Sequence, residues 1–336
     1  MMKAKILNIL RNAKDYVSGQ SLCDMLGVSR TAVWKNINQL KEEGYVIDAV
    51  SNKGYKISEY PDRISDTEIK SLLMSDNDEL EGIIKDVVYF EETDSTNNQA
   101  KKSAGNESNP AKHGTLFITE CQTGGRGRRG RTWISPAGSG IWMSLVLRPE
   151  IEPSSASMLT IVAAMAMTKA ISENVSEAEC KIKWPNDIVL NRKKICGILT
   201  EMSAELEQIH YVVIGIGVNV NTTDFDDSIK EMASSIYLQT GRKTKRSEIV
   251  AAFSKSFEEY YNIFIEKGNL SGIKYAYNEM LINAGREVKI TSAKDEFTGT
   301  ATGIDDVGNL IVNKEDGSKV NVCAGEVSVR GLYGYV

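Results

Sequence analysis

Cysteine and histidine are scarce in this sequence. Five cysteines, an odd number, are spread over 336 residues, and no two are closer than sixteen positions. A disulfide framework or a zinc ribbon needs closely and regularly spaced cysteines, so neither fits, and reduced, buried thiols of a cytosolic protein are expected. Because His113 and His210 are the only histidines, histidine-rich metal chemistry is not expected either.

The sequence also lacks a long apolar segment. Its longest apolar run lies near residues 161–167, far short of the ~20 residues that a membrane span needs. Lys3, Lys5 and Arg11 surround a short apolar patch near the N-terminus, which is typical of a helix start and not of a signal peptide. We therefore expect a cytoplasmic protein without a membrane partner.

An excess of positive charge is absent from the chain as a whole but present locally. Forty basic and forty-five acidic residues give a net charge of −5, which excludes a chain-wide field for nucleic acid. Residues 1–60 carry nine basic and six acidic residues, a net charge of +3. The composition, 41% apolar and 25% charged, is that of a folded globular protein. The uneven charge indicates different partners for different segments.

The first sixty residues show the pattern of a winged helix-turn-helix. One helix is expected over 4–17 and a second after Ser18-Gly19. Ser29, after a tight turn, can cap a third helix that ends at Gly44. Two short strands, 45–47 and 55–57, then form a wing.

The third helix of this module would lie in a major groove of DNA. The candidate DNA-binding residues on this helix and the wing are Ser29, Arg30, Thr31, Lys35, Asn38 and Lys53. A charge of only +3 predicts weak binding by one copy, so a dimer on two half-sites is expected. The alternative is a small helical domain that contacts protein.

The remaining chain divides into two further segments. A polar linker over 61–66 separates residues 1–62 from a larger domain, 63–283, which is followed by a small all-β module, 284–336. Helices are expected at 67–85, 154–174, 249–264 and 270–281. Strands of the larger domain are expected at 87–90, 115–119, 141–147, 181–183, 188–190, 195–201 and 211–220. In the last module they are expected at 288–290, 297–301, 310–312, 320–322 and 327–330. The fold class is α+β.

A glycine–arginine stretch over 124–131 is the most informative motif. It contains Gly125-x-Gly127-x-x-Gly130, but no amphipathic helix follows, so the dinucleotide-binding interpretation fails, as does a Walker A loop. Four arginines within six positions repel each other unless an anion lies among them, and guanidinium groups suit phosphate or carboxylate. An RNA-binding or unbound surface loop is the alternative.

Two further motifs carry polar residues at strand ends. In Lys183-Trp184-Pro185-Asn186-Asp187 a strand would end at the proline and present Asn186 and Asp187. A hairpin could then turn Lys194 back toward Asn186, where it would neutralise a carboxylate and a phosphate as they approach each other. The third motif, Gly215-x-Gly217-x-Asn219, lets a ligand or another backbone approach a strand closely.

Together these motifs resemble those of the bifunctional biotin–protein ligases that also act as biotin-operon repressors. The motifs that appear in the family's order and approximate spacing are Ser95-Thr96-Asn97, Gln122, the 125–133 stretch, Lys183 to Asp187, Lys194-x-x-Gly197-Ile198-Leu199 and Gly215-x-Gly217-x-Asn219. The resemblance implies a mixed sheet with helices on one face, followed by an SH3-like barrel.

The resemblance also implies roles for particular residues. The implied biotin-binding residues are Ser95, Thr96, Asn97, Gln122, Gly125, Arg126, Gly127, Arg128, Lys194, Gly197 and Gly215. The implied ATP- or adenylate-binding residues are Arg128, Arg131, Trp133, Asn186 and Asn219. Lys194, Arg126 and Arg128 would be catalytic. Asp187 is one candidate for a general base.

The implied activity joins biotin to ATP and then to protein. Biotin and ATP, with Mg2+ entering on the phosphates, would give biotinyl-5′-AMP, and a lysine of a biotin carboxyl carrier protein, of acetyl-CoA carboxylase or similar, would accept the biotinyl group. The adenylate would also act as corepressor of a homodimer on operator DNA. The alternatives are a lipoate or octanoate ligase, a non-catalytic sensor, and a ligase whose winged helix no longer regulates.

Overall fold

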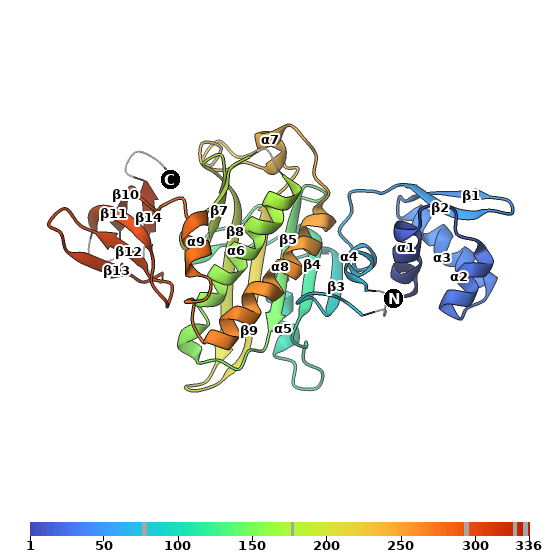
Figure 1. Ribbon diagram of the computed structural model, residues 1–336, viewed down its shortest axis with the longest axis horizontal. Coiled ribbons are helices and arrows are strands. Elements are labelled where there is room, and N and C mark those ends of the chain that lie inside the picture. The colour runs from blue at the N-terminus through green and yellow to red at the C-terminus, as the bar shows by residue number, and fades with distance from the viewer. Residues whose placement is uncertain (76–78, 176–177, 292–295, 325–327, 332–334) are drawn as a thin grey trace.

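The computed structural model describes residues 1–75, 79–175, 178–291, 296–324, 328–331 and 335–336. Over these residues the chain forms three units in a row: a helical N-terminal unit, a central sheet with helices, and a C-terminal sheet (Figure 1). The expected α+β fold class is confirmed. The expected domain bounds stay predictions.

The N-terminal unit is a helix-turn-helix with a two-stranded wing. Its elements are α1 (Met2–Asn12), α2 (Gly19–Leu26), α3 (Arg30–Glu42), β1 (Val46–Val50) and β2 (Gly54–Glu59). The Ser29 hydroxyl accepts a hydrogen bond from the Ala32 amide and so caps α3 as expected. Helix α1 ends at Asn12, short of the expected 17, because Val17 pairs with Tyr55 beside the wing.

The central unit is built on a seven-stranded mixed sheet. Its strands are β3 (Asp86–Thr93), β4 (Thr115–Gln122), β5 (Gly140–Leu147), β6 (Cys180–Lys183), β7 (Asp187–Leu190), β8 (Lys193–Ala204) and β9 (Ile209–Asn219). The spatial order is β3-β4-β5-β9-β8-β7-β6, with β3 and β4 parallel and every other pair antiparallel. The expected strands of this domain are all present.

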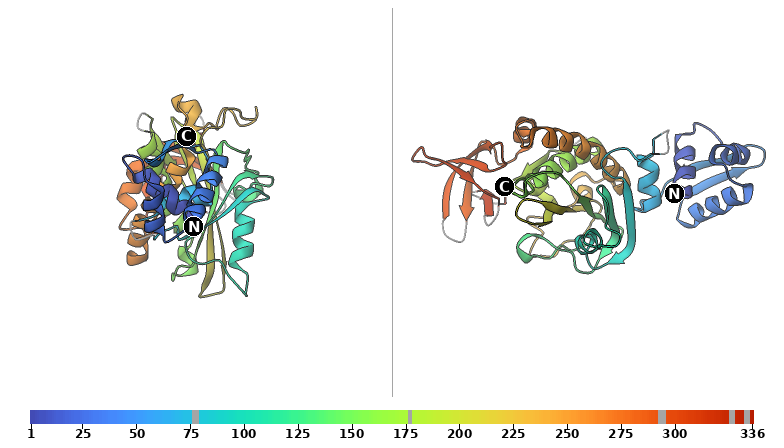
Figure 2. Two further views of the ribbon diagram at one scale, coloured as in Figure 1. Left: turned by 90° about the vertical axis from the view of Figure 1, so that its right-hand side faces the viewer. Right: turned by 90° about the horizontal axis from the view of Figure 1, so that it is seen from below.

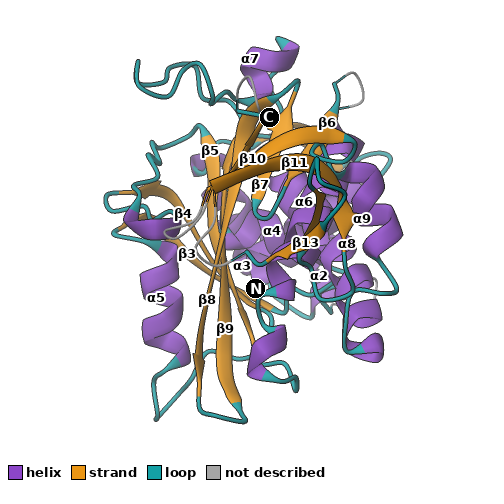
Figure 3. Cartoon of the chain, turned by 90° about the vertical axis from the view of Figure 1, so that its left-hand side faces the viewer, coloured by secondary structure: helices purple, strands orange, loops and turns teal. Residues whose placement is uncertain are grey.

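Helices cover both faces of this sheet. Helices α6 (Met158–Asn174) and α8 (Arg246–Lys267) pack on one face, and α5 (Thr96–Ala104) packs on the other (Figures 2 and 3). Alternation along the strands explains the division, since Leu116 faces the main core while Phe117 joins a small cluster beneath α5. The expectation that helices lie on one face is therefore wrong for α5.

Two expected helices are shorter than their patterns indicated. Helix α4 is Asp66–Leu73, not 67–85, because the backbone at Met74 is already extended and this residue pairs with Leu80. Helix α9 is Lys274–Met280, not 270–281, because α8 ends at Gly268 in a left-handed conformation (φ 67°) and turns follow. A short helix, α7 (Ile236–Thr240), was not expected.

Helix α6 is the central core helix. It is buried on nearly all sides between the sheet and α8, which explains its alanine- and methionine-rich sequence. The stretch Pro153–Asn174 is long and apolar enough to cross a membrane by length and composition, but 72% of its most apolar window is buried inside the protein. Its position is that of a core helix.

The C-terminal unit is a five-stranded antiparallel sheet in the order β13-β12-β11-β10-β14. Its strands are β10 (Arg286–Thr291), β11 (Glu296–Ile304), β12 (Leu310–Asn313), β13 (Lys319–Val322) and β14 (Ser328–Gly331). Val327, the first residue of the expected last strand, lies outside the described residues. The Trp184 indole donates to the Gly308 carbonyl at 3.0 Å and joins this unit to the central one.

The five cysteines are free thiols, but they are not all buried. Cys23 and Cys196 are buried, Cys121 and Cys180 are partly buried, and Cys323 is exposed. The expectation of buried thiols is therefore wrong for Cys323, which lies just after β13.

Candidate active site

A cavity of about 840 Å³ opens on the sheet face that carries α5. The expected ligase residues Ser95, Thr96, Asn97, Gln122, Arg126, Gly127, Arg128, Arg131, Trp133, Asn186, Lys194, Gly197, Gly215 and Asn219 line it, and Gly125 does not. Residues from the glycine–arginine stretch, the β6–β7 turn, β8, β9 and the C-terminal unit therefore share one space. The individual roles of these residues stay predictions.

One end of the cavity is a hydrogen-bonded cluster between α5 and the sheet. The Gln122 side-chain oxygen accepts from the Thr96 amide (2.9 Å) and hydroxyl (3.2 Å). The Ser144 hydroxyl contacts the Thr96 hydroxyl (2.7 Å) and the Asn97 side-chain oxygen (2.5 Å). A Cβ on Gly215, directly opposite Ser144 in the sheet, would lie 2.0 Å from that Asn97 oxygen. Glycine is therefore required there to admit the asparagine.

Trp133 occupies the middle of the cavity above two glycines. A Cβ would lie 2.6 Å from its ring at Gly217 and 2.9 Å at Gly197, and these two glycines are paired across β8 and β9. The Trp133 Nε1 group is buried without a hydrogen-bond partner among the described residues. The expected close approach at these glycines is thus made by an indole whose donor is available to a ligand.

The glycine–arginine stretch is an ordered hairpin. The Gly127 amide donates to the Arg131 carbonyl at 2.7 Å, and the Trp133 amide donates to the Gly125 carbonyl at 2.9 Å. A Cβ on Gly125 would lie 2.2 Å from the Trp133 carbonyl oxygen. Gly125 therefore allows the hairpin to close and has no place on the cavity wall.

The far end of the cavity is held by arginine–amide contacts. Arg128 Nη1 donates to Asn186 Oδ1 at 2.7 Å, and the Asn186 Nδ2 donates to the Ile198 carbonyl at 2.9 Å. Burial lowers the pKa of Arg128. Asn219 donates to the Ser234 carbonyl at 3.2 Å. These contacts fix the β6–β7 turn against β8 and leave the guanidinium beside the cavity.

Lys194 returns to the turn as expected, but its partner is Asp187 and not Asn186. Lys194 Nζ lies 2.6 Å from Asp187 Oδ1, and the Tyr335 hydroxyl donates to Asp187 Oδ2 at 2.5 Å. Burial raises the pKa of Asp187, but Lys194 and Tyr335 outweigh it, so the pKa is lowered. Lys183 Nζ lies 3.2 Å above the Tyr335 ring. Burial lowers the pKa of this lysine to about 7.

Sequence reasoning missed three residues of this site. Ser144 carried no signal, because a single serine in an apolar strand is ordinary. Glu201 lies two residues beyond the Lys194 motif and pairs with α5 and the arginine hairpin. Tyr335 comes from the last residues of the chain. Only the alternation of β8 could have indicated Glu201, which shares a face with Leu199.

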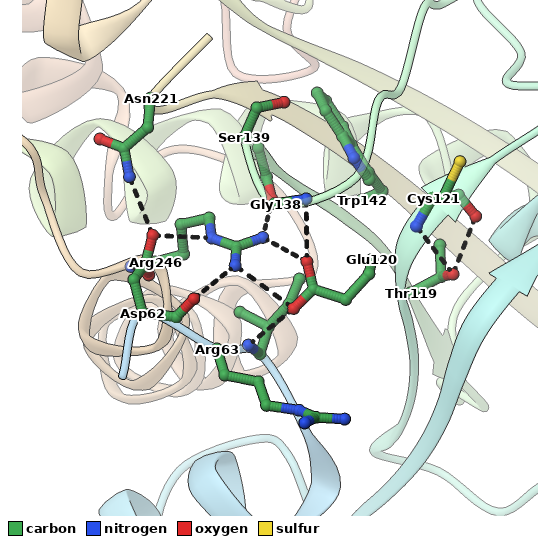
Figure 4. A network of polar contacts seen from close by, with 12 residues as sticks. Asp62, Arg63, Thr119, Glu120, Cys121, Gly138, Ser139, Trp142, Asn221 and Arg246 are labelled. Carbon is green, nitrogen blue, oxygen red and sulfur yellow. Dashed lines mark hydrogen bonds and ion pairs between the residues drawn. The ribbon is translucent and has the colours of Figure 1, made fainter. Parts of the chain in front are cut away.

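A second polar network joins the site to the N-terminal unit. Figure 4 shows Arg246 between Asp62 and Glu120. Arg246 Nη1 lies 2.7 Å from Glu120 Oε2, and its Nε lies 3.1 Å from Asp62 Oδ2. The Glu120 carboxylate also accepts from the Ile64 amide and the Gly138 amide. The segment 61–66, expected to be a polar linker, is thus partly a buried junction.

The surface of the N-terminal unit presents the expected DNA-binding residues. Ser29, Arg30, Thr31, Lys35 and Lys53 are exposed, and Asn38 is partly exposed. Arg30 donates to the Gln20 side-chain oxygen at 2.8 Å, so its guanidinium is oriented. Within the described part of the chain, no group of three or more His, Cys, Asp or Glu side chains could hold a metal ion.

Comparison with known sequences agrees with this architecture. Residues 3–56 match a helix-turn-helix domain, residues 89–219 match the biotin/lipoate A/B protein ligase family, and residues 284–330 match the biotin protein ligase C-terminal domain. The bifunctional ligase/repressor BirA of Bacillus subtilis is 39% identical over 307 residues, 91% of each chain. That of Escherichia coli is 29% identical over 326 residues, 97% of this chain and 96% of its own.

Solved structures agree as well. The biotin protein ligase of Aquifex aeolicus in complex with biotin and ATP is 29% identical, with a TM-score of 0.64, and covers 74% of this chain and 100% of its own. The helix-turn-helix unit, the mixed sheet and the C-terminal module thus occur in the same order as in full-length relatives. The chain belongs to the family of bifunctional biotin ligase/repressors.

Proposed function

We propose that this protein activates biotin with ATP and transfers it to a lysine of a biotin carboxyl carrier protein, of acetyl-CoA carboxylase or similar. One observation carries the proposal: the arginine hairpin and Lys194, more than sixty residues apart in the sequence, line the same cavity. Two anions repel each other and react only where fixed cations offset that repulsion. This cavity provides such a place.

The two ends of the cavity suit the two substrates. The cluster of Thr96, Asn97 and Gln122 offers fixed donors and acceptors to a compact apolar ring system with one polar edge, as biotin has. Trp133, with its unpartnered Nε1, and Arg128 lie toward the other end and suit an adenylate. Lys194 lies between the ends, where a carboxylate and an α-phosphate would meet.

The first step is nucleophilic substitution at phosphorus. A biotin carboxylate oxygen bonds to the α-phosphorus of ATP while the α–β phosphoanhydride bond breaks, which releases pyrophosphate and leaves biotinyl-5′-AMP. Lys194 leaves its ion pair with Asp187 to contact both reacting anions, and Arg126 and Arg128 add positive charge. Each cation stabilises charge that develops during the reaction.

Magnesium would enter with ATP as part of the substrate. The cavity wall offers hard oxygen atoms, namely the Asp224 and Asp226 side chains and the Thr222 hydroxyl, which is buried without a partner among the described residues. Such ligands fit an ion that is held mainly by phosphates and waters. When bound, the ion supplies additional neutralisation of the triphosphate.

The second step is aminolysis. The carrier lysine attacks the biotinyl carbonyl carbon, the bond to AMP breaks, and an amide and AMP result, with one proton released. Asp187 has a lowered pKa and is a weak proton acceptor, so its role is to hold Lys194 in place. A hairpin over the cavity limits hydrolysis of the adenylate until the carrier arrives.

A biotin-dependent exchange of labelled pyrophosphate into ATP tests the first step. The proposal predicts exchange with biotin and none with lipoate or octanoate, the substrates of the related ligases. Exchange with lipoate alone would replace biotin by lipoate as the substrate. No exchange with any of these acids would leave a sensor without catalytic activity.

The N-terminal unit adds a second function, repression. The exposed α3 residues suit a major groove, and a homodimer carrying biotinyl-5′-AMP would place two such helices on operator half-sites. Adenylate binding and DNA binding would then strengthen each other by the same factor. The substrates and the free thiols place both functions in the cytoplasm.

DNase footprinting of the gene's own upstream region, at fixed protein concentration, tests this coupling. Protection should strengthen when biotin and ATP are both present. Equal protection with and without them would contradict the corepressor role while leaving the ligase activity intact.

A further inference from the structure

Glu201 on β8 lies behind the biotin end of the cavity without lining it. Its Oε2 accepts from Asn97 Nδ2 at 2.8 Å, and its Oε1 lies 2.7 Å from Lys101 Nζ and 3.5 Å from Arg126 Nη1. Its partners therefore come from α5 and from the arginine hairpin. Two of them, Asn97 and Arg126, line the cavity.

We propose that Glu201 is a positioning residue for biotin, acting through Asn97 and Arg126. This inference rests on the proposed function, since it concerns the binding of that substrate. A single carboxylate orders one polar side chain on the cavity floor and one cation at the cavity mouth. It thereby sets both the hydrogen bonds and the charge that biotin meets.

The first part of the argument is the direction of the hydrogen bonds. An ionised carboxylate only accepts, so it draws the Nδ2 side of the Asn97 amide and leaves Oδ1 to the Ser144 hydroxyl at 2.5 Å. Gly215 leaves no other room, because a Cβ there would overlap the same oxygen. The amide is thus held in one orientation of the two that its shape allows.

The second part is charge. Lys101 and Arg126 approach the same carboxylate oxygen, and without its negative charge they would repel each other. Arg126 Nη1 also donates to Asn98 Oδ1 at 3.1 Å, so the guanidinium is held at two points although its side chain is 46% exposed. Burial raises the pKa of Glu201, but its hydrogen bonds from Lys101 and Asn97 outweigh this, and the pKa is lowered.

Glutamine at this position cannot reproduce both contacts. Its oxygen can accept from Asn97 or from the cations, but its amino group then faces a donor on the other side. Glu201→Gln therefore keeps the size of the side chain and breaks one half of the arrangement. The affected contacts belong to the biotin end, whereas Trp133 and Asn186 contact none of them.

The test is steady-state pyrophosphate exchange with the full-length Glu201→Gln protein, with biotin and ATP varied separately. Hydrogen bonds to charged groups are among the stronger ones, so we expect the KM for biotin to rise about tenfold. The KM for ATP and the kcat should stay within about twofold, because the lost contacts bind ground state and transition state alike. Equal rises in both KM values, or an unchanged KM for biotin, would overturn the inference.

Two further variants separate positioning from general loss of structure. Glu205→Gln, a matched change at an exposed carboxylate near His210, should leave both KM values unchanged. Asn97→Ala combined with Glu201→Gln should raise the KM for biotin by less than the product of the two single effects, because Glu201 acts partly through Asn97. A fully multiplicative effect would contradict this route. Absence of exchange in the unaltered protein would refute the proposed function instead.

Discussion

Lys183 combines deep burial with a positive charge. It is 5% exposed, its ammonium lies over the Tyr335 ring, and Asp187 attracts it without fully offsetting its burial. The sequence motif around it predicted Asn186 and Asp187 as the functional side chains. It did not indicate Lys183, because the ring that covers this lysine comes from the other end of the chain.

This burial predicts a pH-dependent gain in stability for Lys183→Met. Burial lowers the pKa of the folded lysine from 10.5 to about 7. Between these values the unfolded chain binds more protons, so the free energy of unfolding rises with pH. Below pH 7 both forms are protonated and the cost of burying the ammonium is complete. The variant should therefore raise the thermal midpoint most below pH 7 and least near pH 10.5.

Thermal unfolding at a series of pH values checks this expectation. Lys255→Met is the control, because that lysine is exposed on α8 beside Glu81, and its effect should not vary in the same way. A midpoint gain for Lys183→Met that is equal at every pH would show that Lys183 is not held with a lowered pKa.

At the scale of elements, strand β9 organises both ends of the cavity. Alternate residues Gly215, Gly217 and Asn219 face the cavity, while the residues between them face α6. The sequence predicted close approach at these glycines. What approaches, Asn97 at one glycine and Trp133 at the other, could not be predicted, because both come from segments about a hundred residues away in the chain.

Substitution of the two glycines should separate the two substrates. In Gly215→Ala the new Cβ would lie 2.0 Å from Asn97, and in Gly217→Ala it would lie 2.6 Å from the Trp133 ring. Gly215→Ala should raise mainly the KM for biotin, and Gly217→Ala mainly the KM for ATP, in pyrophosphate exchange. Each variant controls for the other, being two residues away on one strand. The same pattern of KM changes in both would refute the division of the cavity.

Helix lengths show where local patterns mislead. Residues 67–85 have helical spacing, yet α4 stops at Leu73 and Ile83 and Ile84 are buried in a non-helical segment. Helix α5 was not expected, although Ala100 and Ala104 stand one turn apart on its buried face. Tertiary packing outweighs helix propensity in such short elements.

At the scale of the whole molecule, two buried junctions join the DNA-binding unit to the ligase unit. In one, Glu68 on α4 accepts from Arg11 of α1 at 2.8 Å and from the Tyr45 hydroxyl at 2.5 Å. In the other, Arg246 links Asp62 to Glu120, two residues before Gln122 of the biotin end. Polar composition alone predicted a linker at 61–66, because composition does not reveal that a distant arginine pairs with it.

Removal of Arg246 should therefore destabilise the protein. Arg246→Met leaves Glu120 buried without its cation, and breaking a buried pair in this way costs about 3–5 kcal/mol. Asp62→Asn, whose partner keeps Glu120, should cost less. Urea unfolding followed by circular dichroism measures both. Equal free energies of unfolding for Arg246→Met and the unaltered protein would show that the junction contributes nothing to stability.

Mass spectrometry of an apo carrier domain, incubated with this protein, biotin and ATP, tests the central claim most directly. That claim is that cations from the hairpin and from β8 serve one reaction in one cavity. The account predicts a gain of one biotinyl group per carrier, and almost none with Lys194→Ala, whose circular dichroism should match the unaltered protein. Full modification by the well-folded Lys194→Ala variant, or none by the unaltered protein, would contradict it.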